Sequence, residues 1–313
     1  MALEVLVYDA TDAQHYADLI RAPRGRVSVH VASTPEEAAK HIETTEVLYA
    51  WKPPAHLYAQ APRLRWLQAM GAGVDWALVP ELPRRVIVTR SPGVFGPWMA
   101  EYVLAWCLSV TQRMSDYRAA QARREWIQHE PPARLSGKTI AIVGLGDIGR
   151  TVARAARGVG VRVIGVTRSG RPVAGVARVY RSRDLGRALA AADFVVLVVP
   201  LNDTTRGMIG TRELETMRST AWLLNIGRGA LIDESALVQA LQQRTIAGAI
   251  LDVFTAEPLP SDHPLWGLDN AVITPHISGP NLPEEIVPVF NDNLARYLAG
   301  RPLRHVVDRR RGY

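Results

Sequence analysis

The chain has 313 residues, which is long enough for two domains with separate cores. It is 48% hydrophobic and carries a formal net charge of +7. No stretch reaches the roughly 18 consecutive apolar residues of a membrane-spanning helix. The start, MALEVLVYDA, has neither the basic segment nor the cleavage site of a secretory signal. The sequence therefore predicts a cytoplasmic protein that does not bind membranes.

Cys107 is the only cysteine, so the chain can form no internal disulfide, as expected in a reducing compartment. It lies in an apolar helical pattern and is predicted to be a small buried hydrophobe. The positive charge comes almost entirely from arginines that are scattered along the chain. Nucleic-acid binding is one interpretation of such a surplus, and attraction of small anions into a cleft is another. The scatter favours the second, and we expect no nucleic-acid partner.

The first hundred residues alternate short apolar strands with helical segments. Apolar runs predict strands over 3–9, 26–32, 45–51, 64–70 and 85–90, with helices over 12–20 and 35–42. This alternation is typical of an α/β unit with a parallel sheet.

A second α/β series follows a long helical stretch over residues 97–127. Its predicted strands are 139–143, 162–166, 194–199, 221–226, 246–253 and 270–275, and one last amphipathic helix covers 284–299. These strands are nearly all apolar, as expected for strands that are covered on both faces of a sheet. Two α/β domains with parallel sheets are therefore predicted.

The segment TIAIVGLGDIGRTVARAARG carries the spacing G-x-G-x-x-G between a predicted strand and a predicted helix, which is the context of a dinucleotide-binding turn. Gly144 would permit the tight turn, Gly146 the approach of a pyrophosphate, and Gly149 the close packing of helix on strand. Asp147 and Ile148 would begin the helix, whose N-terminus favours phosphate. The alternative is a purely structural strand-to-helix turn.

The end of the next strand, GVTRSG, holds no acidic residue. An acid there would accept hydrogen bonds from a ribose 2′-hydroxyl and repel a 2′-phosphate. Instead, Thr167 and Ser169 offer hydroxyls, Arg168 offers a guanidinium suited to phosphate, and Arg171 could close over the site. This predicts a preference for NADP(H). The alternative is that Arg168 points into solvent and NAD(H) serves as well.

Three stretches, LLNIGRGALIDESAL, AILDVFTAEPLP and VITPHISG, each end a predicted strand. Ligands of doubly wound sheets bind at the carboxyl ends of strands, so we expect Arg228, Asp252, Glu257 and His276 to converge there beside the nicotinamide. An arginine can clamp a substrate carboxylate and polarise a keto oxygen. A histidine can give that oxygen a proton as hydride arrives, with a carboxylate to orient it and stabilise its protonated form. No cluster has metal-ligand spacing, so no metal is predicted.

These motifs, GLGDIG, NIGRGALIDESAL, LDVFTAEPLP, HPLW and TPHISG, stand in the order found in one family. Over nearly its whole length the sequence resembles the D-2-hydroxyacid dehydrogenases. The resemblance implies that Arg228 binds substrate, Glu257 partners the histidine and His276 is the acid/base. It also implies that Asp252 faces the nicotinamide carboxamide.

Within the family, WKPP, GAGVDWAL, TRSG and the closing VDRRRGY resemble the bacterial glyoxylate/hydroxypyruvate reductase A type, which favours NADPH and acts mainly as a reductase. The resemblance implies that the backbone N–H groups of Ala72 and Gly73 hold the substrate carboxylate, since glycines there let the backbone come close. Trp51 would wall the substrate pocket or belong to ordinary core packing. Further positions expected at the cofactor are Pro200, Ile226 and Gly279.

The resemblance also implies the domain organisation: a Rossmann cofactor domain, residues 99–280, inserted into a flavodoxin-like substrate domain, residues 1–98 plus 281–313. The long segment 97–127 would supply much of a homodimer interface.

The expected function is NADPH-dependent reduction of a small 2-keto acid, glyoxylate or hydroxypyruvate, to the D-2-hydroxy acid. One alternative is a dehydrogenase of another D-2-hydroxy acid, such as D-3-phosphoglycerate. Another is a nucleotide-sensing binding protein on the same fold, which an intact Arg, Glu and His set does not by itself rule out.

Overall fold

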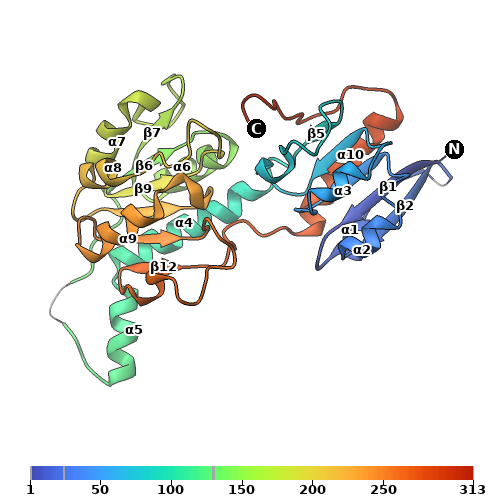
Figure 1. Ribbon diagram of the computed structural model, residues 1–313. Helices are drawn as coiled ribbons and strands as arrows, with labels where there is room; N and C mark the ends of the chain where they lie inside the picture. The colour runs from blue at the N-terminus through green and yellow to red at the C-terminus, as the bar shows by residue number, and fades with distance from the viewer. Residues whose placement is uncertain (1, 24, 129–130, 313) are drawn as a thin grey trace. The chain divides into compact units, whose positions relative to one another are not determined.

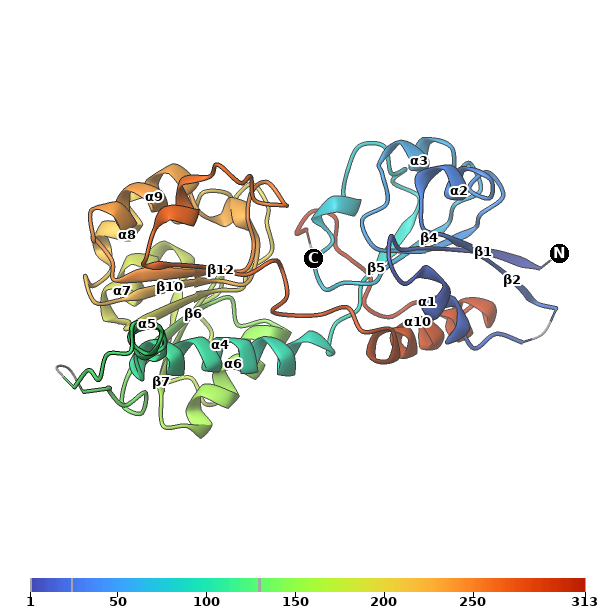
Figure 2. The ribbon, with the colours of Figure 1, turned by 90° about the horizontal axis from the view of Figure 1, so that it is seen from below.

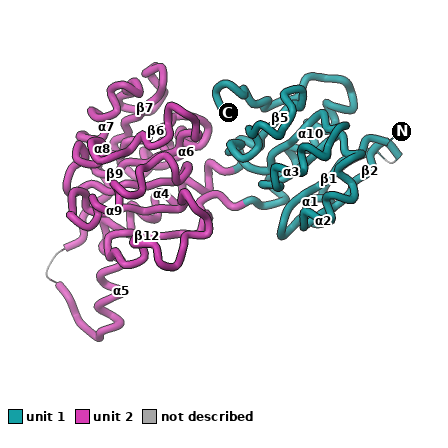
Figure 3. Tube along the Cα trace, viewed as in Figure 1, with its two compact units in different colours: residues 1–94, 281–313 teal, residues 95–280 magenta. Residues whose placement is uncertain are grey.

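The computed structural model describes residues 2–23, 25–128 and 131–312, so His129 and Tyr313 of the sequence lie outside the described residues. The chain divides into two compact units, residues 1–94 with 281–313 and residues 95–280 (Figures 1 and 3). The division expected from the sequence had its first boundary after residue 98. In the structure that boundary comes four residues earlier, because helix α4 starts at Phe95 as part of the second unit.

The first unit contains a five-stranded parallel sheet in the order β2-β1-β3-β4-β5. Its strands are β1 (Leu3–Tyr8), β2 (Val27–Ala32), β3 (Val47–Ala50), β4 (Trp66–Ala69) and β5 (Ile87–Thr89). Its helices are α1 (Ala13–Asp18), α2 (Pro35–Ala39), α3 (His56–Ala59), the 3-10 turn η1 (Asp75–Ala77) and α10 (Pro283–Leu298). This strand order is that of the flavodoxin-like doubly wound fold, so the predicted fold class is confirmed for this unit.

Helix α10 joins the C-terminal segment to this sheet through aromatic packing. The ring of Phe290 stacks on Tyr49 with centroids 4.2 Å apart and on Trp66 at 5.3 Å, and Tyr297 stacks on Trp66 at 5.4 Å. Phe290, Tyr49 and Trp66 are fully buried. This stack of large rings joins helix α10 to the first unit's core.

The second unit contains a seven-stranded parallel sheet in the order β12-β11-β10-β9-β6-β7-β8. Its strands are β6 (Thr139–Val143), β7 (Arg162–Thr167), β8 (Arg178–Arg181), β9 (Phe194–Leu197), β10 (Trp222–Asn225), β11 (Gly248–Leu251) and β12 (Ala271–Ile273). With β6 as first strand, this is the Rossmann order with one strand added. The predicted Rossmann class is confirmed, but β8 was not predicted, because its exposed arginines and half-buried Val179 and Tyr180 give no apolar run.

Helices cover both faces of this sheet. Its helical elements are α4 (Phe95–Thr111), α5 (Met114–Arg123), α6 (Asp147–Gly158), α7 (Leu185–Ala191), α8 (Thr211–Thr216), α9 (Glu234–Gln242), and the 3-10 turns η2 (Ser182–Asp184), η3 (Gly229–Leu231) and η4 (Pro264–Gly267). Figure 2 shows α4 and α6 together on one face, with α8 and α9 on the other. Over the described ranges, no helix is long and apolar enough to span a membrane.

The helical stretch predicted over 97–127 is two helices. Helix α4 ends at Thr111, and Arg113 has φ +54°, a left-handed conformation that a continuing α-helix does not contain. Helix α5 then buries only Ala120, and the structure shows it projecting from its unit (Figure 1). The final predicted helix, 284–299, agrees with α10 to within one residue at each end.

Candidate active site

The glycine-rich turn connects β6 to α6. Gly144 has φ +107°, and a Cβ there would lie 2.6 Å from the carbonyl oxygen of Val198. Its N–H donates to the carbonyl of Val166 at 3.0 Å, which ties the turn to the neighbouring strand β7. Both the left-handed backbone and the close approach require glycine at this position.

The other two glycines of the motif differ from each other in their surroundings. A Cβ on Gly149 would overlap the carbonyl of Gly144, so helix α6 packs there on bare backbone. A Cβ on Gly146 would meet nothing within 4 Å. Gly146 is the N-cap of α6, followed by exposed Asp147 and half-buried Ile148. The open space in front of this helix N-terminus fits a pyrophosphate, which the N–H groups of the first turn would bind.

Strand β7 ends at Thr167, and a tight turn follows. The hydroxyl of Thr167 accepts a hydrogen bond from the N–H of Gly170 at 3.0 Å, and Gly170 has φ +67°. The hydroxyl of Ser169 accepts from the N–H of Arg171 at 3.3 Å. Arg168 and Ser169 are both exposed. The turn thus presents an arginine and a serine to solvent at the strand end next to the glycine-rich turn.

The turn after β10 carries Arg228 and is folded by Asn225. The Asn225 side chain donates to the carbonyl of Arg228 at 2.9 Å and accepts from the N–H of Gly227 at 3.1 Å. Gly229 lies so close to the backbone of Phe254 that a Cβ would overlap it. Asn225 was not singled out in the sequence, although a buried polar residue at a strand end is a signal for such a turn.

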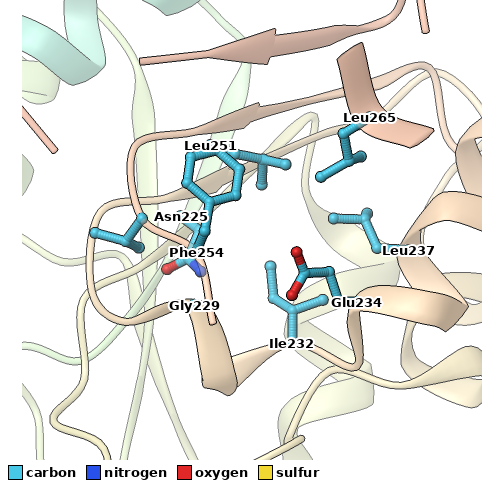
Figure 4. Close-up of a pocket in the computed structure, with 9 residues that line it drawn as sticks. Asn225, Gly229, Ile232, Glu234, Leu237, Leu251, Phe254 and Leu265 are labelled. Atoms are coloured by element: carbon cyan, nitrogen blue, oxygen red, sulfur yellow. The ribbon is translucent and has the colours of Figure 1, made fainter. Parts of the chain in front are cut away.

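A small apolar pocket lies behind this turn (Figure 4). It is lined by Asn225, Gly229, Phe254, Leu237 and Leu265, among others. Phe254, Leu237 and Leu265 are members of the unit's hydrophobic core. The pocket is therefore a packing gap in the hydrophobic core beside the Arg228 turn, and not a substrate site.

Asp252 follows β11 and is completely buried. Its Oδ1 accepts from the Thr274 hydroxyl at 2.6 Å and from the N–H of Ile277 at 2.9 Å, and its Oδ2 accepts from the N–H of Ser278 at 2.9 Å. Because Thr274 uses its proton on Asp252, Tyr102 of helix α4 donates to the Thr274 oxygen at 2.7 Å. Burial raises the pKa of the Tyr102 hydroxyl, which keeps it a donor. This buried carboxylate fixes the loop that carries the predicted acid/base histidine.

Glu257 and His276 form the pair predicted from the sequence. Nδ1 of His276 lies 2.9 Å from Oε2 of Glu257, and Oε1 of Glu257 accepts from the N–H of Phe254 at 3.1 Å. The backbone of His276 has φ +56°, and its N–H donates to the carbonyl of Asp252 at 2.9 Å. With Nδ1 donating to a carboxylate, Nε2 is the ring nitrogen left for exchange of a proton with substrate. The two side chains are 27% and 28% exposed, so the pair is accessible.

Three other predicted positions follow strands at the same edge of the sheet. Pro200 comes after β9, and its carbonyl accepts from the hydroxyl of Thr205 at 2.7 Å. Ile226 follows β10 and is buried. Gly279 lies after β12, where a Cβ would touch Met99 and Phe95 of α4 at 3.3–3.4 Å. All three are placed at the carboxyl ends of strands, where a ligand of this fold binds.

In the first unit, Trp51 follows β3 and the segment 71–73 follows β4. These strands pair in parallel with Ala50 opposite Ala69, so their carboxyl ends are adjacent. The Trp51 ring packs so closely on Gly71 that a Cβ there would overlap it. Ala72, Gly73 and Trp51 are all half-buried. Trp51 therefore shapes the loop predicted to hold the substrate carboxylate, and its role in a substrate pocket stays a prediction.

Ser91 holds this loop in place and was missed in the sequence. Its N–H donates to the carbonyl of Gly71 at 3.1 Å, and its hydroxyl donates to the carbonyl of Ala69 at 2.9 Å. Gln68 donates to the Ser91 hydroxyl at 3.2 Å and accepts from the Asn293 side chain at 3.1 Å. Ser91, Gln68 and Asn293 are all fully buried. The signal was a small polar residue directly after a strand, in SPG.

Known proteins resemble this chain in sequence and in fold. The sequence model for "D-isomer specific 2-hydroxyacid dehydrogenase, NAD binding domain" matches residues 104–278. A glyoxylate reductase of Thermococcus gammatolerans is 36% identical over 77% of this chain and 75% of its own length. A glyoxylate/hydroxypyruvate reductase A of Serratia proteamaculans is 32% identical over 84% of this chain and 86% of its own.

Two solved structures are similar over the full chain. One is an NADPH-dependent glyoxylate/hydroxypyruvate reductase from Sinorhizobium meliloti in complex with NADP and sulfate, with 28% identity, TM-score 0.90 and full coverage of both chains. The other is a D-isomer specific 2-hydroxyacid dehydrogenase from Xanthobacter autotrophicus in complex with NADPH and MES, with 32% identity, TM-score 0.89 and coverage of 100% and 99%. Fold, glycine-rich turn and matched domain define the protein as a nicotinamide-dependent oxidoreductase. More closely, the chain belongs to the D-isomer specific 2-hydroxyacid dehydrogenase family.

Proposed function

We propose that this enzyme reduces small 2-keto acids, glyoxylate and hydroxypyruvate, to D-2-hydroxy acids with NADPH. The observation that carries the proposal is the hydrogen-bonded pair of His276 and Glu257, 2.9 Å apart at the same sheet edge as the Arg228 turn. A histidine oriented by a carboxylate is a general acid, and a nearby arginine suits a substrate carboxylate. The names of the two relatives above support this choice of substrates.

In the proposed reaction, the nicotinamide supplies the hydride that reaches the keto carbon. Nε2–H of His276 donates its proton to the keto oxygen as that oxygen gains negative charge, and Glu257 orients the ring through its contact with Nδ1. Arg228 is proposed to bind the substrate carboxylate, and the backbone N–H groups of Ala72 and Gly73 are proposed as substrate-binding groups of the first unit. A general acid of this kind contributes roughly 10²–10⁴ in rate.

The cofactor is proposed to be NADP(H), with NAD(H) as the weaker alternative. Gly144, Gly146 and the first turn of α6, with Asp147 and Ile148, would hold the pyrophosphate. Thr167, Arg168 and Ser169 would hold the 2′-phosphate, since a guanidinium and hydroxyls suit a phosphate and no acid opposes it. Pro200 and Gly279 are proposed as further cofactor contacts. Ile226, Asp252 and Gly149 are buried, so they are proposed to shape the cofactor site from beneath its surface. The NADP(H) bound in both solved structures described above supports this choice.

The unit of residues 95–280 is proposed as the dinucleotide-binding domain and the other unit as the substrate-binding domain. A homodimer is also proposed. Its support is a set of exposed apolar side chains on α4, on α5 and just beyond: Leu108, Met114, Tyr117 and Trp126, an exposure that marks interaction surfaces. Light scattering with chromatography tests it, and a monomer at micromolar concentration would contradict it. The expected cytoplasmic location stays a prediction.

The test of the function is a set of initial rates read from nicotinamide absorbance. NADPH and NADH are each combined with glyoxylate, hydroxypyruvate, pyruvate and phenylpyruvate. We expect the fastest turnover with NADPH and either glyoxylate or hydroxypyruvate. Binding of NADPH without turnover of any keto acid would contradict the proposal and favour another hydroxy acid, such as D-3-phosphoglycerate, or a nucleotide-sensing role.

A further inference from the structure

Strand β8, which the sequence pattern did not indicate, places an additional arginine beside the end of β7. The two strands pair in parallel with Thr167 opposite Arg181. Arg181 is the last residue of β8, as Thr167 is the last of β7. In a sheet, neighbouring strands lie about 4.8 Å apart. Arg181 is therefore next to the turn that presents Arg168 and Ser169.

The side chain of Arg181 lies across that turn. A Cβ on Gly170 would come within 2.5 Å of Cγ of Arg181, so the aliphatic part of the arginine rests on the bare backbone of the glycine. Gly170 is in the left-handed region with φ +67°, where a larger residue is disfavoured. The glycine therefore serves two purposes, since it closes the turn and leaves room for Arg181. Arg181 is exposed, so its guanidinium is accessible to a ligand.

The charge of this edge favours an anion. Between Arg162 and Arg187 the chain has seven arginines and one acidic residue, Asp184. Asp184 belongs to the 3-10 turn η2, three residues beyond the end of β8. A phosphate monoester carries up to two negative charges near neutral pH, and a planar guanidinium can bind two of its oxygens at once. Two arginines that flank one turn suit this ligand better than one.

We propose that Arg181 is a second arginine of the 2′-phosphate site and a determinant of NADP(H) over NAD(H) in this chain. The inference rests on the proposed use of NADP(H), and extends it to a residue of a different strand. Arg168 and Arg181 bind the phosphate from neighbouring strand ends. The aliphatic part of Arg181 rests on the backbone of Gly170.

The test compares Arg181→Ala with Arg178→Ala in the full-length protein. Arg178 is the matched control, because it is an exposed arginine of the same strand whose guanidinium lies 4.8 Å from the Tyr180 ring. Calorimetry measures the binding of 2′,5′-ADP, NADP⁺ and NAD⁺ without any turnover. We expect Arg181→Ala to weaken 2′,5′-ADP and NADP⁺ about tenfold, the loss of one charge-assisted hydrogen bond, and to leave NAD⁺ unchanged. Arg178→Ala is expected to leave all three unchanged, and Arg181→Lys to restore part of the loss.

The outcomes separate this inference from the proposed function. If the wild-type protein binds NADP⁺ no better than NAD⁺, the proposed cofactor preference fails, and the inference fails with it. If the wild type prefers NADP⁺ and Arg181→Ala binds 2′,5′-ADP as tightly as wild type, only the inference is overturned. An equal loss of NADP⁺ and NAD⁺ also overturns it, because the residue would then act on the turn as a whole. Circular dichroism checks that each variant is folded.

Discussion

The two halves of the seven-stranded sheet differ in how the residues at their strand ends are arranged to bind ligands. At the ends of β11 and β12, Asp252 accepts three hydrogen bonds and Glu257 holds both His276 and a backbone N–H. At the ends of β6 and β7, the predicted cofactor site consists of open space beside Gly146 and the exposed side chains of Arg168 and Ser169. The first site is built from side chains that already bond to one another. The second is a shape in the backbone with exposed charge beside it.

This difference follows from what each site must do. A proton donor acts within a narrow geometry, so it has to be oriented before the substrate arrives. A dinucleotide offers many contacts over its length, and the N–H groups of a helix end can bind phosphate without any side chain. Mutations at the ends of β11 and β12 should therefore change turnover, and mutations at the ends of β6 and β7 should change cofactor affinity.

The largest effect is expected at the acid/base. His276→Ala should lower kcat about a thousandfold, because proton donation by an oriented general acid is lost. The Kd for NADPH, from fluorescence titration, should stay within about twofold, as the glycine-rich turn is untouched. Unchanged turnover would remove His276 from the mechanism.

The next effect separates two glycines of one motif. Gly146→Ala adds a methyl group into open space at an ordinary φ of −75°, so the melting temperature should stay at the wild-type value. Its Kd for NADPH should rise about a hundredfold, because the methyl group keeps the pyrophosphate from the N–H groups and charge-assisted hydrogen bonds are lost. Gly149→Ala instead drives a Cβ into the Gly144 carbonyl and should cost about 2 kcal/mol of folding stability. Cofactor binding unaffected in Gly146→Ala would contradict the placement of the pyrophosphate.

Asp252→Asn should reduce both stability and turnover. An amide presents an N–H₂ group where the carboxylate now accepts from Ser278 or from Ile277, so one buried donor loses its acceptor, at about 2 kcal/mol. Thermal denaturation and kcat measure the two effects. The matched control is Asp269→Asn, an exposed carboxylate paired with Arg244, which should change neither. Wild-type values in Asp252→Asn would mean that the buried carboxylate does not hold the His276 loop.

The smallest effect is at the exposed arginine. Arg168→Ala should raise the KM for NADPH about tenfold, because one charge-assisted contact to the 2′-phosphate is lost. The KM for NADH should be nearly unchanged, since that cofactor has no phosphate at this position. Steady-state kinetics with both cofactors measure this, and equal effects on the two would exclude a phosphate role.

Local patterns predicted the parts of the molecule that depend on local chemistry. The glycine-rich turn was readable because its glycine spacing stands between an apolar strand and a helical pattern. His276, Glu257 and Arg228 were readable because each follows an apolar strand. Both predicted fold classes are confirmed by the observed strand orders. The break at Arg113 was not readable, since the flanking residues continue the helical pattern and only a left-handed residue ends it.

The residues that were missed in the first unit act over long distances in the chain. Ser91 bonds to Ala69, and Gln68 bonds to Asn293, 225 positions away. No window of sequence contains such a pair, so their role in shaping the loop at Ala72 and Gly73 is visible only after folding. Strand β8 was missed for a different reason. As an edge strand it is half-exposed and polar, and its identity comes from pairing with β7 and not from its own composition.

The most direct test of the central claim follows the hydride itself. NADPH in which both hydrogens at the reactive nicotinamide carbon are replaced by deuterium is incubated with hydroxypyruvate and the enzyme, and the glycerate is analysed by mass spectrometry and chiral chromatography. We expect one deuterium at C2 and the D enantiomer, with label transfer lost in step with turnover in His276→Ala. Unlabelled product, or the L enantiomer, would contradict a D-specific hydride transfer and with it the proposed function.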